Sequence, residues 1–199
     1  MARRIKEEPI VHKNRIANEA IKLFSKKGIV NTSMDDIAKS AKYSKATLYV
    51  YFQNKDEIVS FIEYKSMVTL RDAIKKAIDE KSDRKQTFLS ICEALTAYRN
   101  EYPDFFERSM RYISVDTSSE AYIVGEDINA LLEEYLKEGV EAGDFKENAN
   151  YFEFIFQLWG MISGIIRLAG EKEEYILYAG KISKEQFLRD SFEIIFNLL

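Results

Sequence analysis

Hydroxyl and ammonium side chains are concentrated in one short stretch of the chain, TSMDDIAKSAKYSKATLYVYFQNK. Such groups donate hydrogen bonds to phosphate oxygens, and most hydrogen bonds between proteins and DNA go to the phosphate and sugar backbone. We expect Tyr49 and Tyr51 to donate through their phenolic hydroxyls and Lys55 to add positive charge. Thr32 and Ser33 offer amide and hydroxyl groups to a further phosphate. The alternative for the two tyrosines is a place in the core of a small packed domain.

The same stretch contains side chains that can contact the edges of DNA bases. Ser44 is of a type that begins helices, so Lys45, Ala46 and Thr47 fall in the first turn of a short helix. A lysine there can donate to guanine, and Val50, one turn further on, can contact a thymine methyl group. This pattern predicts a helix that reads sequence in the major groove.

Three helices must position these groups. The first should run over about 10–27 and end at Gly28, a residue type favoured just after a helix. The second begins after a cap at Thr32 or Ser33 and breaks near residues 42–43, and the third runs over 44–52. Two short helices joined by a tight break are typical of a helix–turn–helix. In that motif the second helix lies in the major groove while the first crosses the backbone.

The rest of the chain also shows apolar residues at helical spacing and no convincing alternating strand. Asn54 is placed to cap a long helix over 55–80. Further helices are expected at 84–100, 103–114, 119–142, 147–169 and 184–198, with EKEEYILYAGK as the last separator. We therefore expect an all-α protein with an N-terminal three-helix DNA-binding domain over 1–54. A larger helical domain over 55–199 starts with the long helix.

The net charge of −4 is unevenly distributed between the two parts of the chain. Residues 1–55 hold 12 Lys and Arg against 5 Asp and Glu, a balance of +7. Residues 56–199 hold 17 against 28, a balance of −11. A basic segment suits a polyanionic partner, although chance clustering on solvated faces gives the same numbers. Arg3 and Arg4 form either an arm that reaches phosphates or the minor groove, or a disordered tail.

Composition disfavours several other kinds of site. Cys92 and His12 are the only cysteine and histidine, so we expect no disulfide, no metal site, no cofactor and no histidine-based catalysis. The chain is therefore not expected to be an enzyme. The N-terminal sequence MARRIKEEP lacks the apolar region of a signal peptide. The apolar run 154–169 is shorter than a membrane span and carries Gln157 and Arg167, so a cytoplasmic protein without membrane contact is expected.

Residues 10–58 resemble the N-terminal domain of the TetR/AcrR transcriptional regulators. The matching pieces are FSKKG at the end of the first helix, then TSMDDIAKSA, SKATLYVYF and NKDEI. The most specific part is the spacing Leu48-Tyr49-x-Tyr51-Phe52-x-x-Lys55. The resemblance implies contacts to bases or backbone from Lys45, Ala46, Thr47 and Val50, and contacts to phosphates from Ser33, Tyr49, Tyr51 and Lys55.

The chain departs from the usual family pattern within the turn. A glycine and an apolar residue are common where this sequence has Lys42 and Tyr43, and glycine is common at Ala46. Val50 replaces what is often a larger or polar residue, so the resemblance does not imply a particular operator sequence.

Past residue 60 the resemblance is weak and implies an all-helical domain for ligand binding and dimerisation. The sequence itself favours dimerisation through the helices expected at 147–169 and 184–198, which are rich in apolar residues. Gly160 and Gly164 lie one turn apart, and because glycine inside a helix costs about 1 kcal/mol relative to alanine, close packing of another helix is a reasonable compensation. Two such helices per subunit would form a four-helix bundle about a twofold axis, unless the same stripe packs within one chain. The expected interface comprises Phe152, Trp159, Gly160, Ser163, Gly164, Phe187, Phe192, Ile195 and Phe196.

Aromatic and sulfur-containing residues of the second domain are candidates to line an effector cavity, because small-molecule sites are mostly apolar. For each of them the alternative is an ordinary place in the core. Their abundance favours a hydrophobic or planar effector over a sugar phosphate. The candidates are Phe61, Tyr64, Met67, Tyr98, Tyr102, Phe105, Phe106, Met110, Phe156 and Trp159.

Together these features predict a homodimeric, ligand-responsive repressor that binds a palindromic operator in double-stranded DNA. A small hydrophobic or aromatic effector would release it. Two recognition helices about 34 Å apart would meet successive major grooves. The alternatives are an activator or a regulator that requires its ligand as co-repressor, a helical ligand-binding protein or enzyme, and a structural interaction module.

Overall fold

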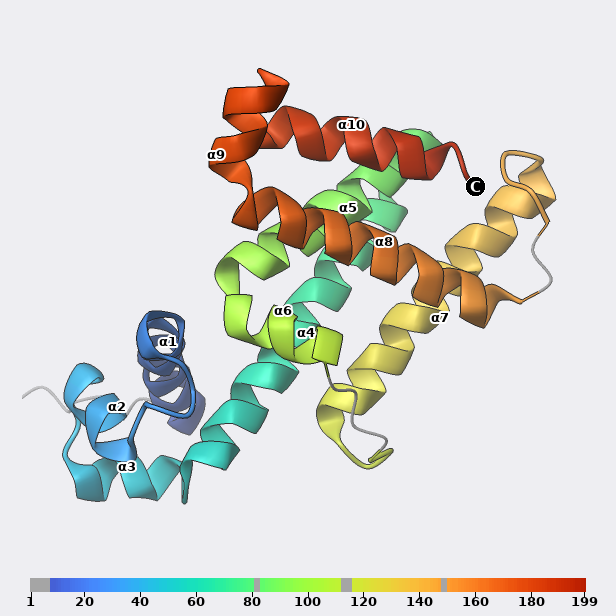
Figure 1. The fold of residues 1–199 in the computed structure, drawn as a ribbon. Helices are drawn as coiled ribbons and strands as arrows, with labels where there is room; N and C mark the ends of the chain where they lie inside the picture. The colour runs from blue at the N-terminus through green and yellow to red at the C-terminus, as the bar shows by residue number, and fades with distance from the viewer. Residues whose placement is uncertain (1–7, 81–82, 112–115, 148–149) are drawn as a thin grey trace, which may run out of the picture. The chain divides into compact units, whose positions relative to one another are not determined.

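The structure is a computed structural model that describes residues 8–80, 83–111, 116–147 and 150–199. Arg3 and Arg4, and with them the expected arm, lie outside these residues. Every regular element within the described ranges is helical, which confirms the prediction of an all-α protein. The described chain forms two compact units, each with its own core (Figure 1).

Unit 1 contains the described residues up to Ser66 together with Tyr102–Arg111, and unit 2 contains the others. The division falls inside the long helix α4 (Lys55–Asp79). The boundary expected at residue 54 concerned the separation of DNA binding from ligand binding, and it stays a prediction.

Unit 1 begins with three helices joined by short turns: α1 (Pro9–Lys27), α2 (Met34–Ser40) and α3 (Lys45–Tyr51). Capping residues set where the second and third begin. The hydroxyl of Ser33 accepts from the amide of Asp36 at 3.1 Å, and the Asp36 carboxylate accepts from the Ser33 amide at 2.9 Å. Ser44 accepts from the amide of Thr47 at 3.1 Å. The three helices enclose a core of almost fully buried side chains: Ile16, Ala17, Ala20, Phe24, Ile37, Leu48 and Phe52.

The turn between α2 and α3 is built on a residue in the left-handed conformation. Lys42 has φ 59°, which costs a non-glycine residue about 1–2 kcal/mol. The turn therefore keeps the backbone that a glycine would adopt, although a lysine occupies the position. Tyr43 supports it, because its amide donates to the Ala38 carbonyl at 2.9 Å and its hydroxyl accepts from Arg15 of α1 at 3.0 Å.

Two further segments complete unit 1. α4 begins after Asn54, whose side-chain oxygen accepts from the amide of Glu57 at 2.8 Å, as expected for a helix cap. α6 (Pro103–Arg111) packs against α1. The ring centroids of Phe105 and Phe24 are 6.5 Å apart at this contact.

Unit 2 is a bundle arranged around α8, which packs against α5, α7 and α10 (Figure 1). Its helices beyond the end of α4 are α5 (Arg84–Glu101), α7 (Glu120–Ala142), α8 (Tyr151–Glu171), α9 (Glu173–Tyr175), the π-helix η1 (Ile176–Gly180) and α10 (Lys184–Phe196). Gly143 ends α7 in the left-handed conformation with φ 79°. The chain then folds back, and the ring of Phe145 lies so close to Gly139 that no Cβ would fit there.

The segment between α8 and α10 differs from the prediction. We expected a separator, but it forms the short helix α9 and the π-helix η1, which ends at Lys181 with φ 57°. Ile176 is buried, while Leu177 and Tyr178 are 61% and 76% exposed. A segment that buries a single apolar residue has no apolar repeat, so the periodicity on which the prediction relied was absent.

The length argument against a membrane span is also wrong for the helix that precedes this segment. α8 has 21 residues and a mean hydropathy of 1.3, so by length and composition it is able to cross a membrane. Only 33% of its apolar window is buried. The core helix of a soluble protein passes the same test, and α8 packs against three other helices, so its composition is weak support for a membrane span.

Candidate nucleic-acid interface and effector cavity

The two faces of α3 differ sharply in exposure. Leu48 is fully buried and Phe52, directly after the helix, is 1% exposed, so these two side chains anchor α3 in unit 1. Val50 is 77% exposed and Tyr49 is 43% exposed. The other predicted base-reading residues are exposed or half-buried on the same short helix and its cap: Ser44, Lys45, Ala46 and Thr47. The structure therefore brings them together on one accessible helix, and their contact with DNA stays a prediction.

Lys45 at the start of α3 has an acidic partner on α2. Its Nζ lies 2.8 Å from Oδ1 of Asp35, and both side chains are more than half exposed. The hydrogen bond and the nearby negative charge raise the pKa of Lys45, so its ammonium stays charged at neutral pH. The predicted reader of guanine is therefore held by a carboxylate in the free protein.

The ammonium of Lys55 is bound to the backbone of unit 1. Its Nζ donates to the carbonyl oxygens of Ile29 at 2.7 Å, Val30 at 3.2 Å and Thr32 at 3.0 Å. These three acceptors match the three donors of an ammonium group. Lys55 thus fixes the loop between α1 and α2, and a phosphate would have to replace one of the carbonyls. The sequence did not indicate this second role.

Thr32 is buried in the free protein, and its predicted contact with a phosphate stays a prediction. Its side chain is 1% exposed, its hydroxyl donates to the Gly28 carbonyl at 2.8 Å, and its amide donates to the Ile29 carbonyl at 3.3 Å. Both donors thus serve the loop. A threonine in a loop satisfies nearby carbonyls as readily as it satisfies a ligand, and the sequence does not distinguish these uses.

Ser33 remains exposed, but its two donors are directed at one carboxylate. Its amide and hydroxyl lie 2.9 Å and 2.7 Å from Oδ2 of Asp36. Lys27 donates to the same oxygen at 2.8 Å. These hydrogen bonds, that of Lys27 foremost, hold the pKa of Asp36 well below its ordinary value. The predicted phosphate contact from Ser33 would therefore compete with a cap that is already formed.

α1 positions the aromatic ring of Tyr51. The ring stacks on His12 with centroids 5.0 Å apart and an interplanar angle of 23°. Nδ1 of the same histidine lies 2.6 Å from the Tyr43 hydroxyl. His12, which composition had only excluded from catalysis, therefore joins α1 to both the turn and the recognition helix. The sequence signal was weak, because a single histidine on a helix has many ordinary roles.

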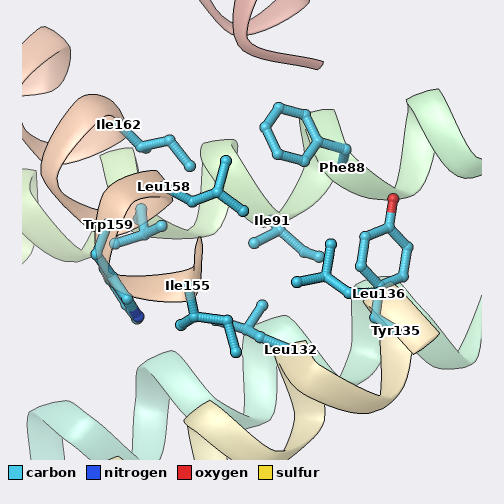
Figure 2. A pocket seen from close by; sticks show the side chains of 10 residues that line it. Phe88, Ile91, Leu132, Tyr135, Leu136, Ile155, Leu158, Trp159 and Ile162 are labelled. Atoms are coloured by element: carbon cyan, nitrogen blue, oxygen red, sulfur yellow. The ribbon is translucent and has the colours of Figure 1, made fainter. Parts of the chain in front are cut away.

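Unit 2 contains an apolar cavity of about 30 Å³ between α5, α7 and α8 (Figure 2). It is lined by Phe88, Ile91, Leu95, Leu132, Tyr135, Leu136, Ile155, Leu158, Trp159 and Ile162. The hydroxyl of Tyr135 donates to the Arg84 carbonyl at 2.7 Å, and burial raises the pKa of this phenol. The cavity walls offer hydrocarbon surface almost exclusively, which suits an apolar part of a ligand.

Of the ten predicted effector residues, only Trp159 lines this cavity. Tyr102, Phe105 and Phe106 are buried in unit 1, and Tyr98 is buried in unit 2. Met110 and Phe156 are 42% and 41% exposed. Phe61 packs against Phe52 with centroids 5.5 Å apart, and Tyr64 and Met67 are half-buried. The prediction missed the cavity because its aliphatic lining has the same sequence pattern as ordinary core.

The predicted dimer residues divide into an exposed and a buried set. Phe152 is 64% exposed, and no atom of the described residues lies within 4 Å of a Cβ built on Gly160 or Gly164. Ser163, Phe192 and Ile195 are instead almost fully buried within one chain. Trp159, Phe187 and Phe196 are half-buried, and Phe196 packs on Phe88 and Phe145.

The exposed apolar and glycine residues of α8 recur at every fourth position and so form one stripe along the helix. Phe152, Phe156, Gly160, Gly164 and Leu168 follow one another at intervals of four residues, and all five are exposed. We expected Phe156 in the effector cavity, which stays a prediction, and we named no role for Leu168. The i, i+4 spacing was visible in the sequence, but it was not separated from the buried stripe of the same helix.

The fold and the exposed helix–turn–helix define a class of DNA-binding regulator, and comparisons with known proteins agree. The sequence profile of bacterial regulatory proteins of the tetR family matches residues 16–60. Over 46 residues the chain is 50% identical to the biofilm operon icaADBC HTH-type negative transcriptional regulator IcaR of Staphylococcus epidermidis. That match covers 23% of this chain and 25% of the relative, so the chain matches only a quarter of the length of this curated protein.

Solved structures extend the similarity over both units. The TetR family transcriptional regulator PfmR from Thermus thermophilus is 28% identical, with a TM-score of 0.71 over 93% of this chain and 98% of that one. The transcriptional regulator FadR from Bacillus subtilis, solved in complex with stearoyl-CoA, is 16% identical with a TM-score of 0.72 over 94% and 98% of the two chains, and it shows the fold alone. The DNA-binding end of the chain is therefore that of a TetR family transcriptional regulator, and the whole chain shares the fold of such regulators.

Lys55→Met tests whether the loop contacts of Lys55 matter in solution. The variant keeps the apolar stem but removes three hydrogen bonds from a charged donor, so we expect unfolding free energy to fall by about 1.5–3 kcal/mol. Urea denaturation measures the loss. Lys39→Met, at an exposed position in α2, is the matched control and should stay within about 0.5 kcal/mol of the parent.

The salt dependence of DNA binding separates the two roles of Lys55. If Lys55→Met left stability unchanged but reduced the salt slope by about one unit, the lysine would hold a phosphate and not the loop.

Proposed function

We propose that the protein is a homodimeric repressor that binds a palindromic operator and is released by a small hydrophobic or aromatic effector. The observation that carries the proposal is the exposure of α3. Its two anchors, Leu48 and Phe52, are buried, while Lys45, Ala46 and Val50 face solvent. Side chains placed in this way can enter a major groove without any change in the core of unit 1. A cytoplasmic location follows from the same proposal, because the operator is there.

The comparison with IcaR, a negative transcriptional regulator, favours repression over activation. The identity between the two proteins covers the DNA-binding end.

The exposed stripe on α8 supports dimerisation. Phe152 and Phe156 together with Leu168 present large apolar side chains to solvent, and the two glycines between them present bare backbone. Exposed apolar surface of this kind commonly marks a protein interface. A twofold axis through such a stripe would make it self-complementary and would pair two copies of α3, as a palindromic operator requires.

The cavity between α5, α7 and α8 supports an apolar effector. Its lining is hydrocarbon, and Trp159 adds a planar wall (Figure 2). FadR of Bacillus subtilis, which has the same fold, was solved with stearoyl-CoA, an example of a long apolar chain held by this architecture. The cavity of about 30 Å³ is far below the roughly 300 Å³ of a typical ligand pocket, so the effector must widen it.

Selection from a random duplex DNA library tests the proposed function. The full-length protein should enrich one inverted repeat, whose half-sites lie about 10 base pairs apart or a multiple of this. Lys45→Ala should then relax the preference at one base position while leaving the others intact. Retention without sequence preference, or no retention, would refute the proposal.

Gly160→Ala with Gly164→Ala tests the dimer face. Among the described residues of a single chain the new methyl groups meet nothing. Because alanine also favours a helix by about 1 kcal/mol per site, each subunit should fold at least as well as the parent. If a second α8 packs on this stripe, the dimer dissociation constant in sedimentation equilibrium should rise at least about tenfold, or 1.4 kcal/mol. Gly125→Ala, on α7, is the control. An unchanged constant would place the interface elsewhere.

Trp159 is the only tryptophan, so its fluorescence reports on the cavity directly. Decanoic acid and naphthalene are suitable apolar probes, and at least one should shift the emission and release the selected operator. Ile91→Phe fills the cavity and should weaken that probe about tenfold, whereas Ile123→Phe, at an exposed site on α7, should not. Probes that shift the emission equally in both variants would bind outside the cavity.

A further inference from the structure

Asp35 is an acidic residue on the surface that the proposed function assigns to DNA. It lies in the first turn of α2, and its Oδ1 is 2.8 Å from Nζ of Lys45, the first residue of α3. The exposed fractions are 54% for the Asp35 side chain and 62% for that of Lys45. A carboxylate in this place repels phosphates, so it weakens general affinity for DNA.

Within the fold, Asp35 places a favourable negative charge in the first turn of α2 but does not complete its cap. The adjacent Asp36 completes the cap of α2 with Ser33 and pairs with Lys27. Within the described part of the chain, Lys45 is the ion-pair partner of Asp35, and an exposed pair of this type contributes little to stability. The main effect of the Asp35 carboxylate is therefore to bind the ammonium group of Lys45.

We propose that Asp35 is a specificity-determining residue, which holds Lys45 as a base reader and prevents its use as a general phosphate contact. The inference rests on the proposed function. An ammonium group has three donors, so Lys45 can keep its bond to Asp35 while another donor meets a guanine acceptor in the operator. Where another base replaces this guanine, the pair of acceptors O6 and N7 is missing.

On DNA without a guanine at this position, the phosphates are the strongest acceptors within reach of the Lys45 ammonium. To reach one, the lysine must leave Asp35, and the carboxylate then faces the DNA backbone without its partner. This free-energy penalty applies when the protein binds non-operator DNA and not when it binds the operator. Repulsive contacts of this kind create specificity.

The test compares two duplexes, the selected operator and a scrambled version of it, across a range of salt concentrations. In Asp35→Asn, Lys45 is free to neutralise a phosphate. The scrambled duplex should bind about fivefold or more tightly with a salt slope steeper by about one unit. Operator affinity should change by less than about threefold, so the specificity ratio falls. Asp35→Glu, which keeps the charge, should behave like the parent.

Two controls separate this role from a general change in charge. Asp56→Asn alters the charge of unit 1 equally at an exposed site on α4, and it should leave the specificity ratio unchanged. In the background of Lys45→Ala the effect of Asp35→Asn should disappear, because a double-mutant cycle isolates the coupling between the two side chains.

The inference is overturned if Asp35→Asn leaves the scrambled duplex and its salt slope unchanged. It is also overturned if Asp56→Asn or the Lys45→Ala background gives the same gain. A parent protein that selects no sequence at all would overturn the proposed function and this inference together. Selection of an operator by the parent with no effect of Asp35→Asn would overturn this inference alone.

Discussion

The arrangement of unit 1 depends on the hydrogen bonds between the ammonium of Lys55 and three carbonyls of the loop after α1. The carbonyls of Ile29, Val30 and Thr32 lie between 2.7 and 3.2 Å from Nζ. Buried or half-buried carbonyls without partners are costly, and this loop contains no helix that would satisfy them. The lysine at the start of α4 therefore holds the loop that leads to the Ser33 cap of α2. α2 in turn packs against α3.

Most polar groups of the candidate DNA surface already have partners in the free protein. Lys45 pairs with Asp35, Ser33 with Asp36, and the hydroxyl of Ser44 with that of Thr47 at 2.7 Å. DNA binding would thus exchange one set of hydrogen bonds for another, which makes the net gain from each contact modest. The compensating advantage is that the side chains are ordered before binding, so less conformational entropy is lost in the complex.

Helix ends were the features best predicted from sequence, because they depend on local chemistry. Ser44 and Asn54 cap the helices that follow them, and Gly143 ends α7 in the left-handed conformation. Lys42 shows the limit of local reasoning, since the turn keeps its left-handed residue without glycine.

Features that depend on tertiary packing were predicted less well. Phe192 and Ile195 had the composition of an interface but are buried in their own chain, and the aliphatic lining of the cavity had the pattern of ordinary core. Even the roles of Thr32 and Lys55 depend on which carbonyls the fold brings near them. Sequence specifies which side chains can donate, but the fold selects their acceptors.

The small size of the cavity bears directly on how an effector could act. A ligand shifts a conformational equilibrium only to the extent that it binds one state more tightly than the other. A cavity of about 30 Å³ has no room for a ligand of ordinary size, so any such ligand must bind a conformation in which α5, α7 and α8 lie further apart. Because Leu132, Ile155 and Leu158 are closely packed, such a ligand binds the conformation with separated helices more tightly than the conformation with the small cavity. α4 contributes residues to both units, so one continuous helix is shared by the unit that contains the cavity and the unit that contains Lys55.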